Sequence, residues 1–179
     1  MPNSLFRKNR NRFFSLFHKK NVTKQGDFAL LRGASEVPLY NSDVSYPEYQ
    51  EAFFYYLFGA VEMDCYGLLD LHNDHAILFV PRLDNLYKIW MTVMTKEESA
   101  AHYELEVRYI DEMEATLEQF KGTMYLNDGV NSDSGLKTIL PDEKYLKSTK
   151  FDREALYEIL VESRVIKNDE EILALRWAS

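Results

Sequence analysis

Two of the four histidines in the chain have acidic neighbours that could form a metal site with them. His72 and His75 lie beside Asp70 and Asp74, and imidazole and carboxylate groups are common ligands of transition metals. The same residues surround Asn73, and an Asn-Asp pair with polar flanks between two apolar runs is typical of a hairpin turn. We identify no third ligand in a distant segment. We therefore interpret the cluster as a turn and predict no metal ligand in this chain.

The other reactive side chains lack the partners that catalysis requires. Cys65 lies in an apolar run without a nearby histidine or a cluster of cations, which is typical of a structural thiol. The sequence has neither a glycine-rich phosphate loop nor a Gly-x-Ser-x-Gly elbow. Acidic pairs such as Glu104/Glu106 and Glu112/Glu114 fit solvated faces. We predict no catalytic residue.

Length and composition indicate one folded domain. The 179 residues are 46% hydrophobic, enough for a single core that buries roughly 70% of the surface of the unfolded chain. The single cysteine excludes an internal disulfide, and no apolar run approaches the roughly 20 residues of a membrane span. The net charge of −8 argues against broad nucleic-acid binding. We expect a cytoplasmic protein that binds neither nucleic acid nor membrane.

The first 26 residues differ from the rest, because they contain several lysines and arginines and no acid. Basic, acid-poor N-termini are typical of mitochondrial presequences, so a mitochondrial location stays open. Apolar residues recur there at helical spacing, however, and an amphipathic helix that packs on a sheet explains them as well. We favour the helix and place it over Leu5 to Lys19, with Ser4 as its N-cap.

Apolar runs further along the chain predict alternating strands and helices. We expect strands at 28–31, 53–58, 65–70, 76–80, 106–110 and 123–126, and a long polar loop at 127–135. Helical segments should follow five residues suited to N-caps: Asp84, Thr95, Asp111, Asp152 and Asn168. The strands 65–70 and 76–80 form a hairpin and are almost continuously apolar, so the sheet should be covered on both faces. The predicted fold class is α/β, a three-layer mixed β-sheet flanked by helices.

Several motifs occur in a fixed order along the chain. They are Asn41-Ser42-Asp43 with Tyr46-Pro47 and Gln50, the aromatic block 53–59, the run 78–83, Trp90, the run 129–135, and the segment 164–176. Together they resemble the N-terminal domain of the Xaa-Pro peptidases, the family of aminopeptidase P and prolidase. Phe79-Val80-Pro81-Arg82-Leu83 and the run 129–135 look closest to the prolidase branch. The family often has an arginine where Tyr49 stands.

The resemblance implies a domain plan. Residues 1–163 correspond to an aminopeptidase P N-terminal-type domain, similar to that of creatinase. Residues 164–179 correspond to a linker and the truncated first helix of a missing C-terminal "pita-bread" catalytic domain. In the family that second domain holds two metal ions, usually manganese, so two Mn²⁺ are expected there and no cofactor in this chain. The chain alone is expected to be inactive on Xaa-Pro substrates.

The resemblance also implies substrate-binding roles for Trp90 and Asp43. Trp90 matches a tryptophan that lines the substrate pocket of the partner subunit, and Asp43 matches an acid that approaches the same site. Family N-terminal domains pair subunits, so we expect a homodimer that binds Xaa-Pro peptides through the full-length protein. Without the resemblance, Trp90 reads as a core residue of its helix and Asp43 as a turn residue.

The function implied is that of the non-catalytic N-terminal domain of a Xaa-Pro dipeptidase or aminopeptidase, a proline-specific metallopeptidase. This domain would serve subunit assembly and shape the substrate pocket of the partner subunit. The alternative is a stand-alone, non-enzymatic protein-interaction module derived from this family.

Overall fold

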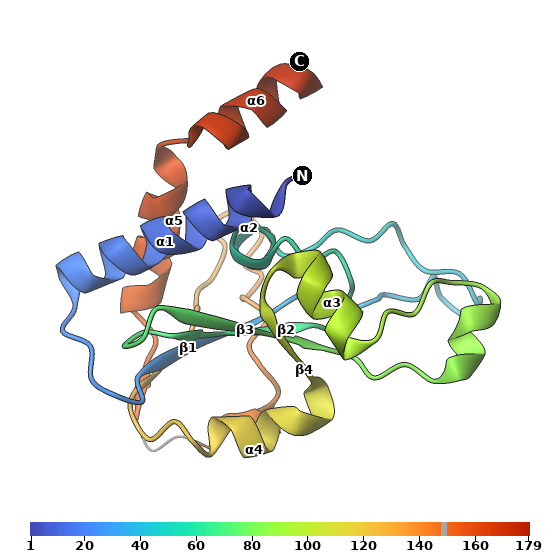
Figure 1. Cartoon of the computed structure of the whole chain (residues 1–179), viewed down its shortest axis with the longest axis horizontal. Helices are drawn as coiled ribbons and strands as arrows, with labels where there is room; N and C mark the ends of the chain where they lie inside the picture. Colours follow the sequence, from blue (N-terminus) through green and yellow to red (C-terminus); the bar gives the residue numbers. More distant parts are fainter. Residues whose placement is uncertain (148–149) are drawn as a thin grey trace.

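The computed structural model describes residues 1–147 and 150–179, and these contain one mixed sheet of six strands. The strands lie in the order β4-β3-β2-β1-β5-β6 (Figure 1). Neighbours β1, β2 and β3 are antiparallel, whereas β4 pairs with β3, β5 with β1, and β6 with β5 in parallel. The bounds are β1 Phe28–Arg32, β2 Tyr66–Asp70, β3 His75–Val80, β4 Glu106–Tyr109, β5 Met124–Tyr125 and β6 Phe151–Asp152.

Helices cover both faces of this sheet. Figure 1 shows α1, α2 and α5 on one face and α4 on the other, with α6 projecting away from the sheet. The α-helices are α1 Asn3–Lys20, α2 Ala52–Phe58, α3 Lys96–Tyr103, α4 Met113–Leu117, α5 Ala155–Val165 and α6 Asp169–Ala178. The 3₁₀ turns are η1 Asn85–Ile89, η2 Ile110–Glu112 and η3 Glu143–Tyr145. The predicted three-layer α/β class is confirmed.

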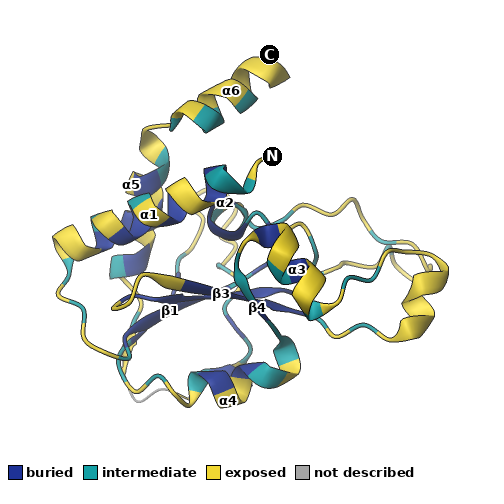
Figure 2. Cartoon of the chain, in the orientation of Figure 1, coloured by how far each residue is buried: buried dark blue, intermediate teal, exposed yellow. Residues whose placement is uncertain are grey.

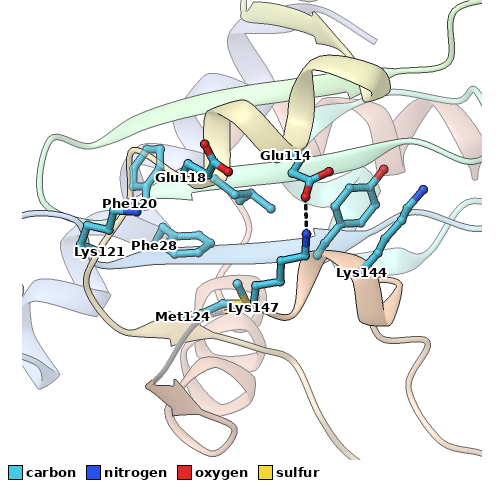
Figure 3. A pocket seen from close by; sticks show the side chains of 10 residues that line it. Phe28, Glu114, Glu118, Phe120, Lys121, Met124, Lys144 and Lys147 are labelled. Carbon is cyan, nitrogen blue, oxygen red and sulfur yellow. Dashed lines mark hydrogen bonds and ion pairs between the residues drawn. The ribbon is translucent and has the colours of Figure 1, made fainter.

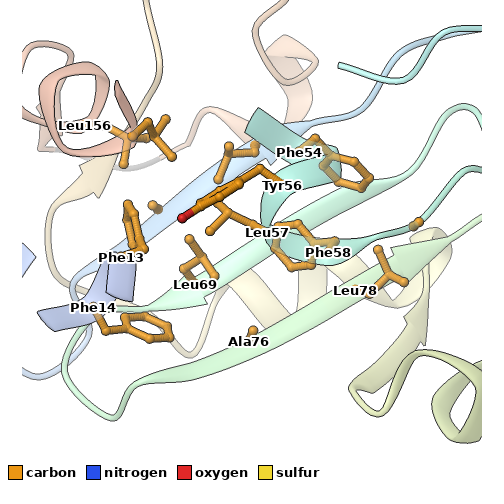
Figure 4. Packing of buried hydrophobic residues seen from close by; sticks show 14 of the residues in the cluster. Phe13, Phe14, Phe54, Tyr56, Leu57, Phe58, Leu69, Ala76, Leu78 and Leu156 are labelled. Carbon is orange, nitrogen blue, oxygen red and sulfur yellow. The ribbon is translucent and has the colours of Figure 1, made fainter. Parts of the chain in front are cut away.

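Alternating side chains of the sheet divide the core into two clusters. Ala29 and Leu31 of β1 join the cluster under α1, α2 and α5, whereas Phe28 and Leu30 join the cluster under α4 and η3. Figure 4 shows the first cluster, in which aromatic rings from α1 and α2 meet leucines of the sheet. All of β2 is buried, and the central strands β1 to β3 are mostly dark blue in Figure 2. The hairpin and its two covered faces are therefore as predicted.

Helix α1 belongs to the core, as the amphipathic-helix interpretation requires. Phe13 and Phe17 are fully buried, and α1 contacts α2 and α5. The predicted cap was wrong, because Pro2 occupies the N-cap position and the Ser4 hydroxyl donates instead to Glu170 at 3.0 Å. In the part of the chain that the structure describes, no helix is long and apolar enough to cross a membrane.

The aromatic block 53–58 forms helix α2, so the predicted strand is wrong. Glu51 caps its N-terminus, because the carboxylate accepts from the backbone N–H groups of Phe53 at 3.1 Å and Phe54 at 2.7 Å. Gly59 ends the helix in the left-handed region at φ +68°, where glycine is unstrained. These caps, together with burial of Phe54 against the sheet, outweigh the β preference of aromatic residues.

Several other predicted features are found close to their expected places. Thr95 and Asn168 form the capping boxes of α3 and α6, and Asp84 caps η1. Asp152 accepts from the backbone N–H of Ala155 at 2.9 Å, at the start of α5. Asp111 does not begin a helix as a cap, because it lies within the 3₁₀ turn η2 that precedes α4. The short strand β6 was not predicted, since two residues carry no periodicity.

Glu51→Ala should lower the free energy of unfolding by about 1 kcal/mol, the usual cost of a lost N-cap. The substitution leaves two N–H groups at the start of α2 without their acceptor. Urea unfolding followed by circular dichroism measures the change. Glu48→Ala is the matched control, because Glu48 is exposed outside the helix. Equal stabilities of the two variants would contradict the capping role.

Candidate functional site

Trp90 lies in a loop that leaves the sheet after β3. This Trp90 loop, residues 81–95, contains η1 and leads into α3. Asp84 Oδ1 accepts from the Leu86 N–H at 2.8 Å, and the Trp90 N–H donates to the Tyr87 carbonyl at 3.2 Å. The tryptophan is 67% exposed, with its ring edge-on to that of Tyr87 at 5.7 Å. Trp90 is thus a surface residue at the end of a 3₁₀ turn, and the alternative that places it in the core is wrong.

The residues around Trp90 are apolar and also exposed. Figure 2 shows this part of the chain, at the right of the view, as an exposed segment. Apolar residues gathered at one surface site are characteristic of interaction surfaces. This apolar strip consists of Trp90 with Leu86, Tyr87, Ile89 and Met91. The sequence did not predict its exposure, because the spacing of apolar residues after a capping residue is the same for a buried and an exposed turn.

Asp43 lies near the tip of a second loop, residues 37–46, which we call the Asp43 loop. A bridge between Pro38 and Ser45 closes this loop, and the Leu39 N–H donates to the Val44 carbonyl at 2.7 Å. Ser42 satisfies the turn, since its hydroxyl donates to the Leu39 carbonyl at 2.7 Å. Asp43 is exposed, and no described residue donates a hydrogen bond to its carboxylate. The carboxylate is therefore free to meet a group from outside.

The Asp43 and Trp90 loops extend beyond the sheet toward the same side of the molecule in Figure 1. Neither loop packs a predicted site residue into the core, since Asp43 and Trp90 are both exposed. No hydrogen bond or ion pair between described residues joins the two loops. Both residues are thus accessible to a second molecule.

The histidine cluster has the structure of a turn. Asp70 Oδ1 accepts from the backbone N–H groups of His72 at 3.0 Å and Asn73 at 3.1 Å. His75 Nε2 contacts Glu106 Oε2 at 2.7 Å, which ties β3 to β4. Among the described residues, no group of three His, Cys, Asp or Glu side chains is placed to hold a metal ion.

Cys65 is fully buried directly before β2. Burial raises the pKa of its thiol far above the usual range, and the nearby Glu62 and Asp64 raise it further. A thiol that stays protonated is a poor nucleophile. The structural role predicted for Cys65 agrees with this environment.

A hollow of about 220 Å³ lies between α4 and η3, away from both loops (Figure 3). Its floor is apolar, with Phe28, Phe120 and Met124. On its rim Lys147 donates to Glu114, which lowers the pKa of that carboxyl. None of the predicted site residues lines this hollow. It is a surface depression of mixed charge beside the second core cluster.

Helix α6 is held at its N-terminus and exposed along its length. Asn168 Nδ2 donates to Asn9 Oδ1 at 2.8 Å, and Lys8 Nζ lies 2.7 Å from Glu170 Oε1. No residue of α6 is buried, and Leu173, Leu175 and Trp177 are exposed. A groove of about 300 Å³ separates this helix from α1 and α2. An apolar helix that projects from its own domain is suited to pack against another.

Comparison with known proteins gives one consistent family. The model of "Aminopeptidase P, N-terminal domain" matches residues 6–125. The chain is 33% identical over 184 aligned residues to the Xaa-Pro dipeptidases of Rattus norvegicus and Homo sapiens, with 100% of this chain covered. It spans 37% of the length of these curated relatives.

Solved structures of aminopeptidase P share the fold. The Escherichia coli enzyme with the inhibitor Pro-Leu gives a TM-score of 0.73 at 20% identity, over 99% of this chain and 42% of that chain. The Pseudomonas aeruginosa aminopeptidase PepP gives a TM-score of 0.76 at 18% identity, again over 99% of this chain and 42% of that chain. At these identities the likeness concerns the fold alone.

Trp90→Ala should change the free energy of unfolding by no more than about 0.5 kcal/mol, because an exposed side chain contributes little to the core. Phe58→Ala is the comparison, since Phe58 is buried and its loss should cost about 3–5 kcal/mol. Urea unfolding measures both. If Trp90→Ala lowered the free energy of unfolding as much as Phe58→Ala, Trp90 would have to be a core residue.

Proposed function

Because the chain belongs to the family of aminopeptidase P N-terminal domains, we propose that it is the non-catalytic N-terminal domain of a Xaa-Pro dipeptidase or aminopeptidase, a proline-specific metallopeptidase. The identity of 33% to Xaa-Pro dipeptidases along the entire chain carries this proposal. Its 37% share of their length supports the idea that catalysis belongs to a second domain. The protein would be a cytoplasmic homodimer.

The Trp90 loop serves the substrate pocket of the partner subunit in this proposal. A flat, exposed indole at the end of a 3₁₀ turn suits the pyrrolidine ring of a Xaa-Pro peptide. The exposed side chains of Leu86, Ile89 and Met91 would be covered when two subunits meet. The apolar strip thus supports both the assembly role and the pocket-shaping role.

Asp43 supplies the charged contact of the same proposal. Its carboxylate has no partner among the described residues and sits on a loop closed by its own backbone. A free carboxylate can hold the amine of a substrate or an arginine of the partner subunit through charge-assisted hydrogen bonds. Asp43 and Trp90 are therefore the substrate-binding residues that we assign to this domain.

Metal chemistry lies outside this chain in the proposal. Two Mn²⁺ in the catalytic domain would activate a water for attack on the carbonyl that precedes proline. The described residues of this chain contain no cluster of metal ligands, so no step of that reaction is assigned to them. Residues 164–179 would lead into the catalytic domain, and the exposed apolar residues of α6 support that boundary.

The alternative is a stand-alone interaction module, which the exposed strip around Trp90 would also serve. The coding sequence beyond Ser179 discriminates between the two functions. A downstream domain with metal-binding carboxylates and histidines supports the peptidase, whereas a stop codon supports the module.

The purified 179-residue chain should not hydrolyse Xaa-Pro dipeptides, even with added manganese, because its described part has no group of three side chains placed to hold a metal ion. Release of free proline measures this, with a prolidase of known activity as the positive control. Metal-dependent hydrolysis that follows the purified chain through gel filtration would refute the proposed division of labour.

Trp90→Ala in the full-length protein should reduce turnover of Xaa-Pro substrates and leave its metal content unchanged. Val22→Ala, an exposed apolar residue in another loop, is the matched control. Mixing tests the action across subunits: Trp90→Ala subunits combined with subunits that lack metal ligands should regain activity. Unaltered kinetics, or no recovery in mixed dimers, would contradict the assigned role.

A further inference from the structure

The Trp90 loop contains a defined 3₁₀ turn although few of its side chains are buried. No residue of η1 is buried, and Trp90 is exposed. Met94 near the end of the loop packs against the first core cluster, but the turn itself has no such contact. A turn with so little hydrophobic packing is expected to move unless other contacts hold it. Ion pairs at the two ends of the loop can hold it instead.

The entry of the loop is held by Arg82. Its Nε lies 2.6 Å from Asp111 Oδ2 and its Nη2 lies 3.0 Å from Asp111 Oδ1, a bidentate pair. The guanidinium carbon also lies 3.7 Å from the centre of the Tyr109 ring. The hydrogen bonds from Arg82 hold the pKa of Asp111 below its usual range. Lysine could not reproduce either the fork or the stacking.

The exit of the loop meets the same residues. Lys96, the first residue of α3, has its Nζ 3.3 Å from Glu112 Oε1 and 5.8 Å from the centre of the Tyr109 ring. Glu112 Oε2 accepts from the Tyr109 backbone N–H at 2.7 Å. The Tyr109 ring thus lies near Arg82 from the start of the loop and Lys96 from its end. Arg82 pairs with Asp111, and Lys96 pairs with Glu112.

These acceptors are fixed to the sheet. Tyr109 is the last residue of β4 and lies in parallel register with Val80, the residue from which the loop departs. Asp111 and Glu112 follow directly in η2. The start of the loop and the residues that hold it are therefore carried by neighbouring strands.

We propose that Tyr109, Asp111 and Glu112 form a clamp that grips Arg82 and Lys96 and thereby positions Trp90 for its contact with the partner subunit. The clamp rests on the proposed function for the purpose of that contact, but its geometry does not depend on it. Isolated surface ion pairs often contribute nothing. Here the Arg82 guanidinium both pairs with Asp111 and stacks on the Tyr109 ring. Lys96 is a second cation near the same ring.

Fluorescence anisotropy of Trp90 tests the clamp in the 179-residue chain. The chain has two tryptophans, so a Trp177→Phe background leaves Trp90 as the only tryptophan. Excitation at the red edge of tryptophan absorption, where tyrosine does not absorb, then selects Trp90. Arg82→Lys and Tyr109→Leu should each increase the amplitude of nanosecond depolarisation, because the loop gains motion. Tyr109→Phe keeps the aromatic ring, so its anisotropy decay should equal that of the Trp177→Phe background.

The matched control is Arg7→Lys. Arg7 and Glu104 form an ion pair with side-chain exposures of 60% and 51%, close to the 54% and 56% of Arg82 and Asp111. This control should leave the Trp90 decay unchanged, and circular dichroism should show all variants folded. If Arg82→Lys and Tyr109→Leu both showed the same anisotropy decay as the Trp177→Phe background, the clamp would be overturned.

Kinetics of the full-length protein separate the clamp from the function on which it rests. Arg82→Lys should weaken Xaa-Pro turnover less than Trp90→Ala, and the double variant should be no slower than Trp90→Ala alone. Additive losses would overturn positioning through Trp90. A changed anisotropy with unchanged turnover in both single variants would leave the clamp standing and refute the role proposed for Trp90.

Discussion

The β2–β3 hairpin is apolar on both of its faces, and this constraint determines the layers around it. All of β2 is buried, as is β3 after its first residue. Such strands are stable only when both faces are shielded from water. Helices α1, α2 and α5 supply one cover, and α4 with η3 supplies the other. The connections that leave the sheet are then free to carry function at the edge of the molecule.

Buried polar contacts fix how the helical cover is assembled. Asn9 Nδ2 donates to the Tyr56 carbonyl at 2.9 Å, and Arg10 Nη1 donates to the Leu57 carbonyl at 2.7 Å. These carbonyls lie in the last turn of α2, where intrahelical donors run out. Burial lowers the pKa of Arg10 to about 10, and the neighbouring Arg7 contributes. Asn9 also meets Asn168, so α1 links α2 to the start of α6.

The fold exposes apolar side chains at two separate places, the Trp90 loop and helix α6. The Trp90 loop presents apolar side chains that the chain does not cover, and the charged residues at its base tie it to β4 and η2. Helix α6 presents a second apolar surface at another end of the molecule, anchored by its capping residues (Figure 1). Exposed apolar surfaces of this kind are suited to contacts with other protein surfaces.

Local sequence alone determined the elements whose signals are contiguous. The hairpin of apolar strands and the capping boxes at Thr95 and Asn168 were readable from neighbouring residues. The order of the motifs along the chain indicated the family. The aromatic block was misread because the Glu51 cap and the surroundings of Phe54 outweigh aromatic β preference only in the folded chain. The exposure of Trp90 and the meeting of Arg82 with Asp111, 29 residues away, were likewise decided by tertiary structure. Spacing along the chain cannot report which face of a turn meets solvent, or which strands become neighbours, since both depend on how the sheet closes.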